Sequence, residues 1–90
     1  MEIIFLPEAE KDLRKINKSA AKSIQNRLFR ILRSIIESPY EGFASPEQLK
    51  HEFTGYWSRE LSKKDRVIYQ VDEETDCVYI YSLLGHYYDK

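Results

Sequence analysis

The chain has 90 residues, of which 42% are hydrophobic and 32% are charged, a balance that predicts one folded domain over residues 1–90 and excludes a disordered chain. The formal net charge of −1 argues against a protein that binds nucleic acid through its overall charge. The single cysteine excludes an internal disulfide, and no apolar run approaches the roughly 18 residues of a membrane span, so we expect a cytoplasmic protein that contacts no membrane.

The first half of the chain predicts a short strand followed by two helices. Residues 3–6 form a continuous apolar run, and Pro7 suits the first turn of a helix. Apolar residues then recur at steps of three and four, which is typical of amphipathic helices. The polar residues 17–19 interrupt this pattern, so two helices are expected, the second ending near Glu37 because a proline follows two residues later.

The second half changes to a two-residue period. Stretches rich in β-branched and aromatic residues predict three strands, at residues 56–61, 66–71 and 77–84. Polar turns between them indicate an antiparallel meander, with a fourth strand if residues 48–53 also extend. The expected fold class is α+β: an N-terminal strand, a two-helix hairpin, then an antiparallel sheet of three to four strands with the helices on one face.

Basic residues are concentrated in the helical region. Eight of them lie between Lys11 and Arg33, against one acid, Asp12. Such a helical face contacts phosphates or an acidic partner, or it is an ordinary solvated face, and the sequence leaves both interpretations open.

The strand pattern predicts that two arginines and the end of the chain lie together. If Leu61 pairs with Arg66 across the turn, then Arg59 pairs with Ile68, and both arginines project from one face. The antiparallel return of the last strand brings His86 close to Arg66. Adjacent arginines repel each other unless they share an anion, and arginine binds phosphate bidentately; the alternative is that both are surface charges.

The remaining polar residues carry little signal one at a time. Glu47 alone would be a loop carboxylate, and Tyr56 and Trp57 suit the core or a sheet face better than base stacking. The two histidines lack the companion spacing of a metal site, so we expect no metal. We find no glycine-rich phosphate loop or serine-triad motif, and expect no cofactor.

Several motifs between residues 39 and 88 follow one another in a distinctive order. They are a P-x-x-G loop, P-E-x-L-K-H, G-Y-W-S-R, D-R-V-I-Y and a final H-Y. In combination they resemble the YoeB (Txe/YoeB) family of bacterial toxins, within the RelE-like superfamily. The resemblance therefore implies a RelE-like fold.

The resemblance also implies a function: the toxin of a type II toxin–antitoxin system, a ribosome-dependent mRNA endoribonuclease that inhibits translation by cutting mRNA in the A site of the 70S ribosome. It implies a YefM-like antitoxin and suggests a homodimer and a toxin–antitoxin complex that binds operator DNA. Four positions match the family's catalytic residues: Glu47 as general base, Arg66 as the arginine that stabilises the transition state, His86 as general acid and Tyr87 as the essential terminal tyrosine. Two more match basic positions that hold the RNA backbone: Lys50 and Arg59.

The chemistry of these residue types agrees with that reaction. RNA cleavage needs a base for the 2′-hydroxyl, an acid for the departing 5′-oxygen and cations for the phosphate charge. Glutamate is ionised at neutral pH, and histidine, whose ordinary pKa is about 6.5, can donate a proton. Glu60 follows Arg59 where some relatives carry a second arginine, which lowers the expected affinity for RNA. A non-catalytic inhibitor of gyrase, similar to ParE-like toxins, and a catalytically silent interaction module are the alternatives on this fold.

Overall fold

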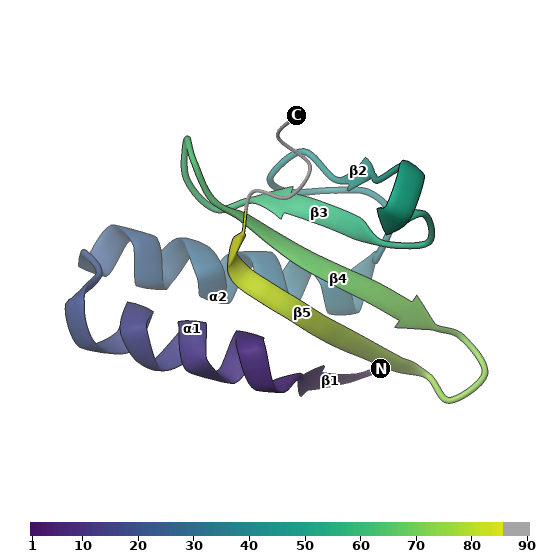
Figure 1. Ribbon diagram of the computed structural model, residues 1–90, viewed down its shortest axis with the longest axis horizontal. Coiled ribbons are helices and arrows are strands. Elements are labelled where there is room, and N and C mark those ends of the chain that lie inside the picture. The colour runs from purple at the N-terminus through teal and green to yellow at the C-terminus, as the bar shows by residue number, and fades with distance from the viewer. Residues whose placement is uncertain (86–90) are drawn as a thin grey trace.

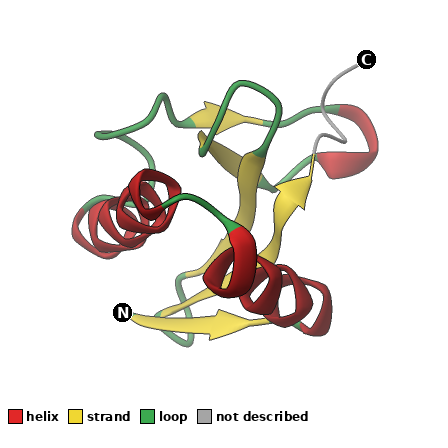
Figure 2. Cartoon of the chain, turned by 90° about the vertical axis from the view of Figure 1, so that its left-hand side faces the viewer, coloured by secondary structure: helices red, strands yellow, loops and turns green. Residues whose placement is uncertain are grey.

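The computed structural model describes residues 1–85, which fold into two helices packed on one face of a sheet (Figures 1 and 2). The elements are β1 (Glu2–Phe5), α1 (Pro7–Ser19), α2 (Lys22–Glu37), β2 (Glu47–Gln48), a short 3₁₀ helix (His51–Phe53), β3 (Trp57–Glu60), β4 (Arg66–Asp72) and β5 (Cys77–Gly85). The predicted α+β class is confirmed, and α2 ends at Glu37 as expected. No helix within residues 1–85 is long and apolar enough to cross a membrane.

The sheet has five strands in the order β1-β5-β4-β3-β2, more than the three or four expected. β1 occupies one edge and runs parallel to β5, so the sheet is mixed rather than antiparallel throughout. At the other edge β2 is only two residues long and pairs with β3. The expected strand over residues 48–53 is not formed, because His51 adopts a left-handed backbone with φ 60° and starts the 3₁₀ helix.

The boundary between the helices also differs from the prediction. α1 continues through residues 17–19 to Ser19, whose hydroxyl donates a hydrogen bond to the carbonyl of Lys15 one turn earlier. Ala20 and Ala21 have extended backbone and form the short connection to α2. A serine that bonds back to its own helix can stay inside it, which explains why the polar run did not end α1.

The core lies between the helices and the helix-facing side of the sheet. α2 contributes Leu28, Ile31 and Ile35, which meet strand residues such as Val67 and Ile80. All five side chains are at most 4% exposed. Burial of such a side chain stabilises the fold by about 1.5–3 kcal/mol, so the core fixes which strand faces point inward.

The register between β3 and β4 places the two arginines on opposite faces. Arg59 pairs with Val67 and Glu60 pairs with Arg66, one residue away from the predicted pairing. The turn is longer than assumed, because the amides of Leu61 and Ser62 both donate to the carbonyl of Asp65. A one-residue shift turns every side chain to the other face of a sheet. The prediction that Arg59 and Arg66 share a face is therefore wrong.

Candidate active site

Arg66 lies at the start of β4, where three strands meet. It pairs with Glu60 at the end of β3 and with Gly85 at the end of β5. Its Nε donates to the hydroxyl of Ser58 at 2.8 Å, and its Nη2 donates to the carbonyl of Ser45, also at 2.8 Å. The side chain alternates with the helix-facing Val67, so it points to the opposite face of the sheet. These contacts orient the guanidinium before any ligand binds.

Glu47 supplies the carboxylate next to this guanidinium. Its Oε1 lies 3.5 Å from Nη2 of Arg66, while its side chain stays 59% exposed. The residues before it have an unusual backbone: Ala44 and Ser45 are both left-handed, with φ of 72° and 53°. Non-glycine residues adopt this conformation only where surrounding contacts hold them, and the carbonyls of both are hydrogen-bonded, to Glu60 and Arg66. The backbone of Ala44 and Ser45 thus holds the exposed carboxylate of Glu47 next to the guanidinium of Arg66, which is itself held in place by hydrogen bonds.

Arg59 has a different environment from the one predicted. Its side chain is 0% exposed on the helix-facing side of the sheet. All five guanidinium N–H groups are used: Nε donates to the hydroxyl of Tyr69, Nη1 to Ser34 Oγ and Phe43 O, and Nη2 to Ser38 O and Glu41 O. A guanidinium enclosed in this way has no donor left for a phosphate. The structure contradicts an RNA-holding role for Arg59 and gives it the task of fixing the loop before β2.

The remaining predicted residues are Lys50, His86 and Tyr87. Lys50 is exposed two residues after β2, and its carbonyl accepts the amide of Phe53 in the 3₁₀ helix. His86 and Tyr87 lie outside the described residues. The last described residue, Gly85, pairs with Arg66 and directly precedes His86 in the sequence. The expectation that the chain end approaches Arg66 is therefore met as far as Gly85.

Aromatic residues around the start of β3 pack against one another. The rings of Tyr56 and Tyr81 lie 5.7 Å apart in an edge-to-face arrangement, and Phe53 contacts both. Trp57 packs against Tyr40 at 5.0 Å on the other side of the strand. These contacts agree with the reading of Tyr56 and Trp57 as packing residues.

Two contributors to the site were not predicted. Ser58 anchors Arg66, and its only sequence signal is a small polar residue in a strand next to an arginine. Asp12 is 5% exposed and bonds to the backbone near the end of β5. Its signal was available, because it is the one acid within the basic stretch of the helices.

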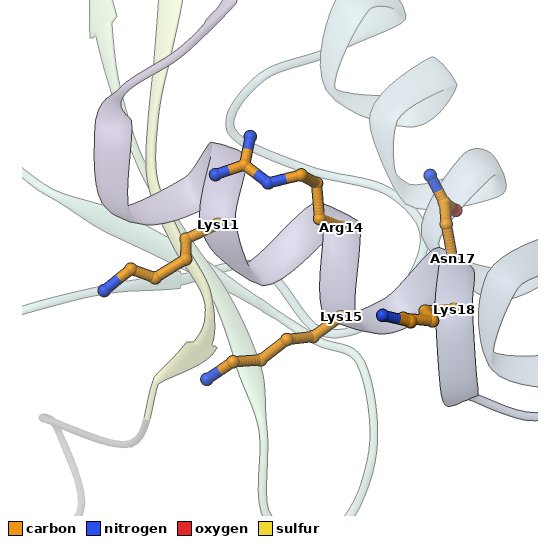
Figure 3. A pocket seen from close by; sticks show the side chains of 5 residues that line it. All are labelled: Lys11, Arg14, Lys15, Asn17 and Lys18. Atoms are coloured by element: carbon orange, nitrogen blue, oxygen red, sulfur yellow. The ribbon is translucent and has the colours of Figure 1, made fainter.

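The basic residues of α1 form a separate open depression on the molecular surface (Figure 3). It is lined by Lys11, Arg14, Lys15, Asn17 and Lys18. The four cations are exposed, and no carboxylate among the described residues lies within ion-pair distance of them. Such a surface attracts a polyanion, in contrast to Arg59, whose donors all bind groups within the protein. Within residues 1–85, no cluster of three or more metal-ligating side chains is found.

Two tyrosines hold the loop after α2 and give it a measurable pH dependence. The hydroxyl of Tyr40 donates to the Glu73 carboxylate at 2.6 Å, and this bond, assisted by burial, raises the pKa of Tyr40 to about 12. Burial likewise raises the pKa of Tyr69, whose hydroxyl donates to the carbonyl of Pro39. A folded-state pKa above the unfolded value of about 10 means that the stabilisation is complete below pH 10 and is lost as the pH rises through 12.

We expect Tyr40→Phe to reduce the loss of stability between pH 9.5 and 12. The variant lacks the phenol whose ionisation is suppressed only in the folded state, so its unfolding free energy should fall less steeply with pH than that of the wild type. Urea unfolding at a series of pH values measures the two slopes. Glu74→Gln, next to the partner carboxylate but outside the bond, is the control and should follow the wild type. Equal slopes for wild type and Tyr40→Phe would contradict the assignment.

The fold and motifs can be compared with known proteins. A family model of YoeB-like toxins of bacterial type II toxin–antitoxin systems matches residues 5–87. The chain belongs to this family. Toxin YoeB of Escherichia coli K12 is 32% identical over 54 residues, which cover 60% of this chain and 64% of that toxin. The chain thus spans slightly less than two thirds of the length of this relative.

Solved structures extend the likeness across the whole fold. The YoeB dimer from Staphylococcus aureus superposes with a TM-score of 0.85 at 32% identity, covering 97% of this chain and 98% of that one. YoeB of the same organism has also been solved in a heterotetrameric complex with the antitoxin YefM. The YoeB/ParE toxin from Agrobacterium tumefaciens has a TM-score of 0.90 at 22% identity, over 97% of this chain and 100% of that one, and so shares the fold. The predicted family and RelE-like architecture are confirmed.

Proposed function

We propose that this protein is the toxin of a type II toxin–antitoxin pair and acts as a ribosome-dependent mRNA endoribonuclease. The observation that carries the proposal is the pair formed by Arg66 and Glu47, with 3.5 Å between Nη2 and Oε1. It places an oriented guanidinium and an exposed carboxylate at the edge where β5 ends at Gly85. The next residue in the sequence is His86, which supplies the remaining acid–base group.

The reaction proceeds by transfer of two protons around one phosphate. Glu47 accepts the proton of the 2′-hydroxyl, and the 2′-oxygen forms a bond to the adjacent phosphorus. Arg66 stabilises the negative charge that grows on the non-bridging oxygens. His86 donates a proton to the 5′-oxygen as the bond from phosphorus to that oxygen breaks. The products are a 2′,3′-cyclic phosphate and a 5′-hydroxyl, with Tyr87 completing the catalytic set beside His86.

The charge distribution favours a reaction that depends on the ribosome. The net charge is −1, and Arg59, one of the two predicted RNA-holding cations, is buried. Lys50 remains as an exposed cation for the mRNA backbone. The positive potential of the protein around Arg66 and Glu47 is therefore weak. The A site of the 70S ribosome, rather than the toxin, positions the mRNA. The basic surface of α1 offers a second contact for ribosomal phosphates.

The surface around Arg66 and Glu47 is also where an antitoxin would inhibit the toxin. The YoeB–YefM complex from Staphylococcus aureus supports a YefM-like antitoxin as partner, and the YoeB dimer of that organism supports a homodimer. An antitoxin segment that covers Arg66 and Glu47 would exclude RNA from the site. The toxin–antitoxin complex is further proposed to bind operator DNA, and the free toxin to act in the cytoplasm, where ribosomes translate.

Primer extension on a translated mRNA, with and without 70S ribosomes, tests this function. We expect cleavage only when ribosomes are present, with breaks at the A-site codon. Glu47→Gln and His86→Ala should each lower the cleavage rate at least about 100-fold, because each removes one of the two proton-transfer groups. Glu47 is exposed, so the thermal midpoint of Glu47→Gln should stay close to that of the wild type, and the same measurement checks that His86→Ala is folded.

The matched control is Glu74→Gln, which removes an exposed carboxylate from the β4–β5 turn at the far end of β4. It should cleave like the wild type. Undiminished cleavage by folded His86→Ala would eliminate the acid assignment. Inhibition of gyrase without mRNA cleavage by the wild-type protein would replace the proposed function with the non-catalytic alternative.

A further inference from the structure

Asp12 is a buried carboxylate whose hydrogen bonds cross 71 residues of sequence. It lies in α1 and is 5% exposed, although its neighbours Lys11 and Arg14 are exposed. One oxygen, Oδ2, accepts the amide of Leu83 at 3.0 Å and the amide of Leu84 at 3.1 Å. A carboxylate is costly to bury unless it is hydrogen-bonded, so these two bonds account for its position.

The two amides that Asp12 binds belong to an irregular part of β5. There the neighbouring strands do not accept these backbone N–H groups. β1 ends at Phe5, opposite Ile80, so the rest of β5 continues without a strand on that side within residues 1–85. On the side of β4, Ile68 pairs with Ser82 and Arg66 pairs with Gly85. Between these two pairs β5 has two residues and β4 has one, so β5 contains one extra residue. This is a β-bulge, which redirects a strand and leaves backbone groups without ladder partners. Asp12 accepts the amides of both residues inside it.

The bulge influences where β5 ends relative to Arg66 and Glu47, the two residues of the proposed cleavage site. Directly after Leu83 and Leu84 comes Gly85, which pairs with Arg66. The strand end is therefore held from two sides: Gly85 pairs with Arg66, and Asp12 binds the amides of the two residues before it. The same strand end is the point from which the chain continues to residue 86.

We propose that Asp12 is a positioning residue for the general acid: from α1 it holds the end of β5 beside Arg66 so that proton donation to the leaving 5′-oxygen is in line. This inference rests on the proposed nuclease function and assigns a role in it to a residue remote from the RNA. Asp12 contacts no substrate. Its effect is exerted through the bulge at Leu83 and Leu84, and it is confined to the step that needs the acid.

Substitutions at Asp12 separate the two hydrogen bonds from the charge. Asp12→Asn keeps an oxygen acceptor and should cleave within about threefold of the wild type. Asp12→Ala removes the acceptor, and a shift of the acid by about 1 Å is enough to lower kcat about 100-fold with KM unchanged. Asp12→Glu keeps a carboxylate but lengthens its stem, so it should also be slow, and it provides a second variant if Asp12→Ala does not fold. Leu13→Ala is the matched control, since it removes core packing from the same helix but leaves the bulge contacts in place.

A substrate that needs no acid distinguishes positioning from a general loss of structure. Sulfur in place of the bridging 5′-oxygen at the A-site linkage leaves as a thiolate without a proton. Single-turnover cleavage of this mRNA on 70S ribosomes by Asp12→Ala or Asp12→Glu should recover to within about threefold of the wild type, as should that by His86→Ala. Glu47→Gln should stay slow on both substrates, because attack by the 2′-oxygen still needs its base.

The outcomes are separable. Equal slowing of the Asp12 variants on the oxygen and sulfur substrates would mean that Asp12 acts on folding alone, and the proposal would be overturned while the nuclease function stood. Asp12→Ala that cleaves the oxygen substrate as fast as Leu13→Ala would also overturn it. If the wild type cleaves neither substrate on ribosomes, the proposed function falls and this inference falls with it.

Discussion

Replacing Arg66 with lysine is expected to lower the rate of mRNA cleavage about 1000-fold while leaving the fold intact. Arginines that neutralise charge in the transition state of phosphoryl transfer contribute about 10³–10⁵ to the rate. Lysine keeps the positive charge but has one nitrogen in place of the fork. In the native structure Nε is held by Ser58 and Nη2 by Ser45, and one ammonium cannot keep both contacts and also bind a phosphate. Charge alone is therefore not sufficient at this position.

Single-turnover cleavage on programmed ribosomes measures this effect. Ser58→Ala removes only the Nε anchor and should cost less, about tenfold, because the guanidinium is still present but less well oriented. The loss of rate in the double variant Arg66→Lys with Glu47→Gln should be far smaller than the product of the two single losses. The reason is that the two groups act on one phosphate. Arg33→Lys, on the exposed side of α2, is the neutral control. Cleavage by Arg66→Lys within tenfold of the wild type would remove Arg66 from the transition state.

The elements of this fold could be predicted because each has a local cause. Steps of three and four indicated both helices, and Pro39 predicted the end of α2 at Glu37. The strands β3, β4 and β5 followed from their β-branched and aromatic residues. What failed was pairing, because it depends on turn geometry. One carbonyl, that of Asp65, accepts two amides and lengthens the β3–β4 turn, which moves Arg59 to the other face.

The site was predicted in part, for a related reason. The resemblance assigns Glu47 and Arg66 to one site, and the structure places Oε1 and Nη2 of these residues 3.5 Å apart; their catalytic roles stay predictions. The roles of Arg59 and Asp12 depend on backbone groups far away in the sequence: loop carbonyls for Arg59 and bulge amides for Asp12. Every residue carries such groups, so no composition or period marks which of them a buried charge will meet. Only the folded chain brings them together.

Replacing Arg59 with methionine is expected to lower the free energy of unfolding by about 3–5 kcal/mol, because each buried acceptor that loses its donor costs about 1–3 kcal/mol. Methionine fills much of the space of the arginine stem but leaves its acceptors without donors inside the protein. They include the carbonyls of Ser38 and Glu41, which lie just after the C-terminal end of α2. No basic residue of α2 itself lies in its last turn, so Arg59 provides the cation that the negative end of the helix dipole favours.

Thermal unfolding should show the loss as a fall in the midpoint of about 20 °C for a domain of this size. Arg59→Lys should fall between methionine and the wild type, because three ammonium donors replace five. Arg33→Ala, an exposed arginine on α2, should change stability by less than about 0.5 kcal/mol. Cleavage should fall as well at temperatures where the variant is folded, because Arg59 binds the carbonyl of Phe43 and so fixes the loop that leads to Glu47. An Arg59→Met protein as stable as the wild type would show that the five hydrogen bonds do no more than offset the cost of burying the charge.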